Sequence, residues 1–212
     1  MHHTYAELEA FLAEIHRVAP EKRTALKGRI KHFQRLGWPS GTNQGKGARV
    51  QYGVGQTLSF AMGFELLQLG LTPERVVGQM KYAGGYLVDG FIECLDQQPE
   101  DPDPVFYIFA PESLHQFRGE AGEAPGFSSM MLSRSEVQKM LPISPLFKSR
   151  RFAFIDMYEV FSAYVEYFQK AGALGEREEL REPLMKWQRL RQDAIDRYYE
   201  RIEELANGNP KA

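Results

Sequence analysis

Residues 22–52 read KRTALKGRIKHFQRLGWPSGTNQGKGARVQY, and this stretch carries the strongest signals in the chain. It holds eight Lys and Arg residues and no Asp or Glu, and the acid-free run continues to Phe64. The other 18 basic residues and all 28 acidic residues lie elsewhere, so a +8 block is set in a chain of formal net charge −2. Such a block repels itself, and its usual use is to neutralise a polyanion. Nucleic acid is the leading candidate, because bound Lys and Arg release counterions from the phosphates. A basic face that is only solvated, without a partner, is the alternative.

The spacing of apolar residues predicts two helices in the first 36 residues. Residues 5–18 carry one apolar stripe, and Thr4 and Glu7 have the spacing of a capping box. Residues 21–36 carry a second apolar stripe together with most of the basic residues. This helix is expected to end at Gly37, because glycine readily adopts the left-handed conformation that follows many helices.

A glycine-rich segment follows the basic helix. Gly45, Lys46 and Gly47 predict a turn, and residues 48–52 predict an extended strand, so the segment is expected to form a hairpin. Helix, break, basic helix and hairpin, in this order, describe a winged helix-turn-helix. An α-helix fits the major groove of DNA, and an adjacent hairpin can donate hydrogen bonds to the backbone or the minor groove.

Three short motifs resemble the DNA-binding domain of MerR-type regulators. Residues 30–38, IKHFQRLGW, are similar to the family's I-R-Y-Y-E-R-x-G-L at the end of its second helix. ARVQY at residues 48–52 resembles the end of the family's wing, and LGLTPERV at residues 69–76 resembles the end of its third helix. The resemblance covers residues 20–80 and implies a winged DNA-binding fold. It departs from the family at Val50, which stands where the wing has Arg.

The predicted partner is double-stranded DNA, and the predicted contacts are the basic residues of the helix and the hairpin with one histidine. These are Lys22, Arg23, Lys27, Arg29, Lys31, His32, Arg35, Lys46 and Arg49. Phe33 and Trp38 are expected in the core. The sequence thus predicts a sequence-specific DNA-binding protein that regulates transcription. Two alternatives stay open: an excisionase or DNA-bending architectural protein, since phage excisionases share the winged fold, and a module whose basic face binds an acidic protein.

Composition and motifs give no indication of catalysis, and we expect no enzyme, cofactor or metal site. The single Cys94 excludes an intrachain disulfide and a cysteine cluster for metal or redox chemistry. Residues 41–47, GTNQGKG, lack the spacing of a phosphate-binding loop. The N-terminus has no apolar signal segment and no apolar run has the length of a bilayer span, which predicts a cytoplasmic protein without a membrane partner.

The pattern changes after residue 95. Residues 96–104, DQQPEDPDP, are acidic and rich in proline and are expected to be a linker. Strands are expected at residues 105–110 and 151–157, with helices around them. The predicted fold class is α+β: a winged helix-turn-helix domain over residues 1–95, the linker, and a small α+β domain over residues 105–212 that ends in a long helix.

An apolar stripe along this last helix, residues 183–205, is the predicted dimer contact. Its members are Trp187, Leu190, Ala194, Tyr198, Ile202 and Leu205. A homodimer gains affinity by presenting two DNA-binding helices to two half-sites. Docking of the stripe on the α+β domain of the same chain is the alternative. The sequence does not indicate an effector ligand.

Overall fold

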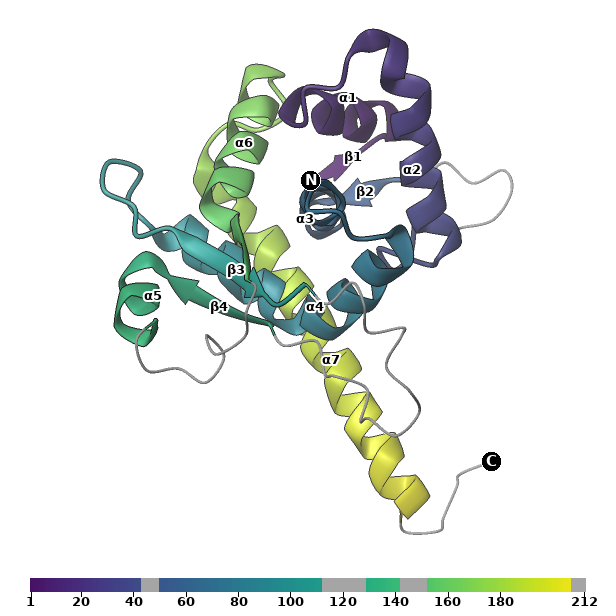
Figure 1. Cartoon of the computed structure of the whole chain (residues 1–212), viewed down its shortest axis with the longest axis vertical. Coiled ribbons are helices and arrows are strands. Elements are labelled where there is room, and N and C mark those ends of the chain that lie inside the picture. Colours follow the sequence, from purple (N-terminus) through teal and green to yellow (C-terminus); the bar gives the residue numbers. More distant parts are fainter. Residues whose placement is uncertain (43–49, 112–128, 142–151, 207–212) are drawn as a thin grey trace.

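A computed structural model describes residues 1–42, 50–111, 129–141 and 152–206. The chain is α+β, as expected: helices predominate, and two small antiparallel sheets accompany them (Figure 1). In chain order the described elements, with η for a 3₁₀ helix, are β1 (His2–His3), α1 (Tyr5–Ile15), η1 (Pro20–Lys22), α2 (Arg23–Arg35), β2 (Tyr52–Gly53), α3 (Val54–Gln68), α4 (Pro73–Asp96), β3 (Val105–Phe109), β4 (Ser129–Ser133), α5 (Arg134–Met140), β5 (Ala153–Asp156), α6 (Met157–Lys170), η4 (Arg177–Leu180) and α7 (Arg181–Ala206).

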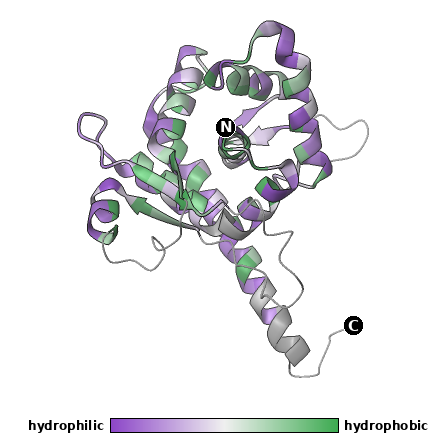
Figure 2. Ribbon diagram, in the orientation of Figure 1, coloured by the Kyte–Doolittle hydropathy of each residue, from purple (hydrophilic) through white to green (hydrophobic). Residues whose placement is uncertain are grey.

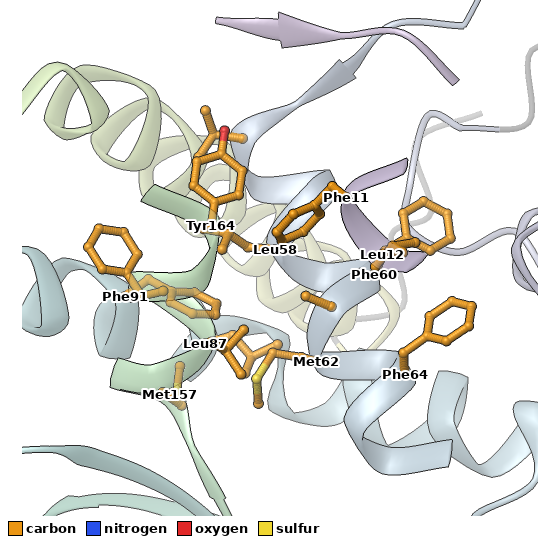
Figure 3. Close-up of a cluster of buried hydrophobic side chains, with 14 of the residues drawn as sticks. Phe11, Leu12, Leu58, Phe60, Met62, Phe64, Leu87, Phe91, Met157 and Tyr164 are labelled. Atoms are coloured by element: carbon orange, nitrogen blue, oxygen red, sulfur yellow. The ribbon is translucent and has the colours of Figure 1, made fainter. Parts of the chain in front are cut away.

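Helix α3 is the centre of the molecule. Its buried residues occur on all sides, from Val54 to Leu66, which is the pattern of a helix surrounded by protein. Helices α1, α4, α6 and α7 all contact it. Figure 2 shows hydrophobic colour along α3, and Figure 3 shows Leu58, Phe60 and Met62 of this helix within the buried cluster.

One hydrophobic core includes residues from both halves of the chain. The ring of Phe11 in α1 lies 5.6 Å from that of Tyr164 and 5.4 Å from that of Phe168, both in α6. Phe91 of α4 lies 6.2 Å from Phe161 of α6. The core therefore continues past the expected linker at residues 96–104, which connects α4 to β3.

Local signals account for the ends of the first helices. Thr4 and Glu7 form the expected capping box at the start of α1. Gly37 has a φ of 73° after the end of α2. The Trp38 backbone N–H donates to the Phe33 carbonyl at 3.0 Å, a bond of the Schellman type that satisfies a free helix carbonyl. Both expected helices are therefore confirmed, with shorter bounds.

The described end of the expected hairpin pairs with the N-terminus. β1 and β2 are antiparallel, with His3 opposite Tyr52 and His2 opposite Gly53. Residues 43–49, with the expected turn and the first two residues of the expected strand, lie outside the described residues. A strand at the N-terminus was not predicted, because two histidines carry no strand signal.

The second sheet has the order β4-β3-β5, and both pairings are antiparallel. In the central strand, Tyr107 and Phe109 are buried, and α4 and α6 contact this strand. The strands expected at residues 105–110 and 151–157 are confirmed as β3 and β5. This sheet and α5 lie apart from α2, on the other side of α3 and α4 (Figure 1).

Helix α7 begins in the core and then extends away from the body of the molecule (Figure 1). Leu184 of α7 is fully buried, as is Leu180 at the end of η4, whereas Leu190 is 60% exposed. Across the part of the chain that the structure describes, each helix is too short or too polar to span a bilayer.

Candidate nucleic-acid interface

Helix α2 lies at the periphery of the molecule and buries one face (Figures 1 and 2). Leu26, Ile30 and Phe33 form the buried stripe, as their spacing of four and three predicts. The capping and packing of α2 thus fix which residues point outward. The exposed basic residues of the helix and of the η1 turn before it are Lys22, Lys27, Arg29, Lys31 and Arg35.

Three of these cations form one row. Lys27, Lys31 and Arg35 follow each other at intervals of four residues, which places them above one another on a helix. Arg29 lies on a different side of the helix and is also exposed. The solvent face of α2 is therefore basic along its length, opposite the buried stripe.

Two of the predicted contacts are partly neutralised by an acid from another helix. Glu9 of α1 accepts a hydrogen bond from Arg23 Nη1 at 2.9 Å and lies 3.8 Å from Lys27 Nζ. The Glu9 side chain is only 12% exposed, so this pairing is built into the α1–α2 contact. Lys22, Arg29, Lys31 and Arg35 make no ion pair with any described residue. The pairing with Glu9 could not be predicted from the acid-free stretch, because Glu9 lies outside that stretch. It comes close to Arg23 and Lys27 only when α1 packs against α2.

His32 is held by an acid of α4. Its Nε2 atom lies 3.1 Å from Glu74 Oε1, in the first turn of that helix. A backbone hydrogen bond, assisted by bonds from Thr72 and His32, lowers the pKa of Glu74, so this carboxyl group is charged at neutral pH. A phosphate that approached His32 would meet the Glu74 carboxylate. The structure thus gives His32 a partner within the protein.

Two glutamines tie the described residues on both sides of residues 43–49 to the helices. Gln34 Nε2 of α2 donates to the Thr42 carbonyl at 3.2 Å and to the Tyr52 hydroxyl at 2.8 Å. Gln56 of α3 donates to the Ser40 carbonyl at 2.7 Å and accepts from the Gly53 backbone N–H at 2.9 Å. Thr42 and Tyr52 therefore both lie beside the C-terminal end of α2. Lys46 and Arg49 lie outside the described residues.

The sequence did not identify Gln34 or Gln56 as important. Gln34 stands where the MerR motif has Glu, and a glutamine that bonds residues eight and 18 positions away leaves no local pattern. Only the pairing of β1 with β2 and the packing of Tyr52 bring these groups together.

The two aromatic residues of the motif belong to the core, as expected. Phe33 and Trp38 are buried, and their rings meet edge to face at 5.2 Å. Gly63 of α3 makes room for the indole, since a Cβ atom there would lie 2.7 Å from Trp38. Neither ring is available for stacking on a base.

The predicted dimer stripe is divided between the core and solvent. Trp187 packs on α3 at Gly55 and lies 6.3 Å from the ring of Phe91. Leu190 and Ala194 are exposed. The three remaining members of the stripe have side chains outside the described part: Tyr198, Ile202 and Leu205.

The described residues around α2 do not form a metal site, and the one thiol of the chain lies in the interior. Within the described ranges, no three His, Cys, Asp or Glu side chains are grouped so that they could hold a metal ion. Cys94 is buried on α4, and burial raises the pKa of its thiol far above the usual value, which leaves it protonated. The outward face of α2 offers positive charge and hydrogen-bond donors.

Comparison of the chain with known protein families, with curated proteins and with solved structures found no match.

Proposed function

We propose that the protein binds double-stranded DNA and that α2 is the helix that enters the major groove. The observation that carries the proposal is the exposed basic face of α2. Four of its cations have no acidic partner among the described residues: Lys22, Arg29, Lys31 and Arg35. The helix that carries them is held in place, because its apolar face is packed in the core. Cations held this way on a rigid element are suited to phosphates and to the acceptor groups of guanine.

The base of the residue 43–49 segment supports a winged arrangement. The Gln34 and Gln56 hydrogen bonds hold both sides of this segment beside the end of α2 that carries Arg35. Lys46 and Arg49 lie outside the described residues and stay predicted DNA contacts. In the winged helix-turn-helix that we propose for residues 1–95, the segment would contact the DNA backbone while α2 reads the bases.

We further propose that the protein acts as a dimeric transcriptional regulator. The exposed part of α7 is the proposed contact between two copies, because Leu190 and Ala194 continue the apolar stripe beyond the docked Trp187. Two copies would bring two α2 helices to two half-sites, which raises affinity and sets the spacing of the sites.

The salt dependence of DNA binding tests the proposal. The full-length protein is titrated into a fluorescent pool of random duplexes at several salt concentrations. Four to five cations on phosphates predict a slope of about −4 for log affinity against log salt. Selection of bound duplexes then reports sequence preference. Selection of a motif supports a regulator, and bound DNA that bends without a motif supports an architectural protein.

No binding at low salt, or a flat salt response, contradicts the proposal. An acidic protein as the partner is then tested with polyglutamate, which offers carboxylates without the spacing of a duplex. Binding of polyglutamate but not of duplex DNA would assign the basic face to that class of partner.

A further inference from the structure

A glycine lies in the middle of the basic face of α2. Gly28 follows Lys27 directly, and Lys31 and Arg35 lie one and two turns beyond it on the same side of the helix. The residue is exposed.

The fold does not require glycine at this position. Gly28 lacks a positive φ, and a Cβ atom placed on it would meet no atom within 4 Å. Gly55 and Gly63 differ, because a Cβ atom on either would collide with Trp187 or Trp38. In a helix interior, glycine is the least favourable residue after proline. Gly28 therefore weakens α2 without giving any packing in return.

The absence of a side chain gives a ligand access to the helix backbone. Beside Gly28 the long side chains of Lys31 and Arg35, which make no ion pair with a described residue, can bend aside, whereas a Cβ and the atoms beyond it cannot be removed. A groove edge or a phosphodiester strand could thus lie against the backbone of α2 while these two cations bind phosphates.

We infer that Gly28 is the point of closest approach between DNA and α2, and that it sets how deeply the helix enters the groove. This inference rests on the proposed function. It makes Gly28 a positioning residue, since its role is to exclude a side chain from the contact.

Replacing Gly28 with lysine distinguishes a close contact between DNA and the α2 backbone from electrostatic attraction alone. Gly28→Lys adds a positive charge to the basic face, so electrostatics alone predicts tighter DNA binding. If DNA must contact the helix backbone here, the new side chain blocks it and binding weakens. The matched control is Ala25→Lys, which adds the same charge at another exposed position of α2.

The experiment measures duplex binding by the full-length wild type and by Gly28→Lys, Gly28→Ala and Ala25→Lys at one salt concentration. We expect Gly28→Lys to weaken binding at least about tenfold, the scale of one lost groove contact. Ala25→Lys should bind as tightly as the wild type or tighter. Thermal unfolding gives a second readout: Gly28→Ala should raise the melting temperature by about 2–4 °C, because it removes the glycine penalty. A cooperative melting transition of Gly28→Lys shows that weaker binding by this variant does not come from unfolding.

The possible failures are distinguishable. If the wild type does not bind duplex DNA, the proposed function itself is wrong. If the wild type binds and Gly28→Lys tightens binding as much as Ala25→Lys does, the function stands and close approach at Gly28 is wrong. A Gly28→Ala variant that melts at a lower temperature than the wild type would give the glycine a structural role and would also overturn the inference.

Discussion

The imidazole of His3 and the hydroxyl of Tyr164 share a hydrogen bond of 2.6 Å, although 161 positions separate them in the chain. His3 also stacks on Phe168 with ring centroids 3.9 Å apart. These contacts fix the N-terminal strand β1 against α6, and β1 in turn pairs with β2 beside the end of α2. The position of the candidate interface therefore depends on residues that lie far apart in the sequence.

The two buried histidines predict a loss of stability in mild acid. Burial lowers the pKa of His3 and of His16 to about 4, from an ordinary value of 6.5. Because the folded pKa values are depressed, the unfolded chain takes up protons first. The free energy of unfolding should keep the full contribution of these neutral histidines above pH 6.5 and should fall as the pH drops from 6.5 to 4. Each shift corresponds to about 3 kcal/mol.

Urea unfolding at pH 7.5, 5.5 and 4.5 measures this effect. Burial raises the pKa of Glu65, which lies 3.3 Å from His16, so protonation of Glu65 offsets part of the His16 loss. His3→Gln is the cleaner variant, and it should remove much of the pH dependence. A wild-type stability that stays constant between pH 7.5 and 4.5 would show that these histidines are not neutral and buried.

A methyl group at Gly55 should loosen the docking of α7. A Cβ atom there would lie 2.5 Å from the Trp187 ring, so Gly55→Ala should cost about 1–3 kcal/mol of unfolding free energy through overpacking. Chemical denaturation measures the change. The matched comparison is Gly28→Ala, where the added atom meets nothing. Equal effects of the two substitutions would argue against a close Gly55–Trp187 contact.

Removal of the acid beside α2 should strengthen DNA binding. Glu9→Gln takes the negative charge away from Arg23 and Lys27 and makes these cations available to phosphates. We expect tighter binding and a salt slope that is more negative by about one. Glu166→Gln, at an exposed position of α6, is the control for the change in net charge. Weaker binding by Glu9→Gln alone would mean that Glu9 orients Arg23 and Lys27 for the contact.

The exposed end of α7 should carry self-association. A chain that ends at Gln192 keeps the buried Leu184 and the docked Trp187, so it should fold, but it lacks the predicted stripe from Ala194 onward. We expect the full-length protein to be a dimer and the shortened protein a monomer with weaker DNA binding. Light scattering measures both masses. A full-length monomer, or a dimer that survives the truncation, would remove α7 from the dimer contact.

Local patterns predicted α1, α2 and α7 and the strands β3 and β5. The stripe of Leu26, Ile30 and Phe33 and the Thr4 capping box each depend on neighbours within one or two turns, so they can be recognised in the sequence. The contacts that shape the candidate site are different in kind. The ion pair of Glu9 with Arg23 and the hydrogen bond from Gln34 to the Tyr52 hydroxyl join separate elements. Such contacts follow from packing around α3.

The predicted two-domain division illustrates the same limit. The acidic, proline-rich residues 96–104 have the composition of a linker, yet composition does not show whether the flanking segments share a core. The aromatic contacts of Phe11 and Phe91 with α6 cross that boundary. Experiments on the interface are therefore best made on the full-length chain.

The exposed cations of α2 should bind DNA, and the double variant Lys31→Ala/Arg35→Ala removes two of them. Lys139→Ala, at an exposed position of α5 on the far side of the molecule, is the matched control. Duplex binding is measured for the three full-length proteins across a range of salt concentrations. We expect the double variant to bind about 10- to 100-fold more weakly, with a salt slope smaller in magnitude by about two, and Lys139→Ala to bind like the wild type. Equal binding by all three proteins, or a loss confined to Lys139→Ala, would show that the α2 cations do not bind DNA.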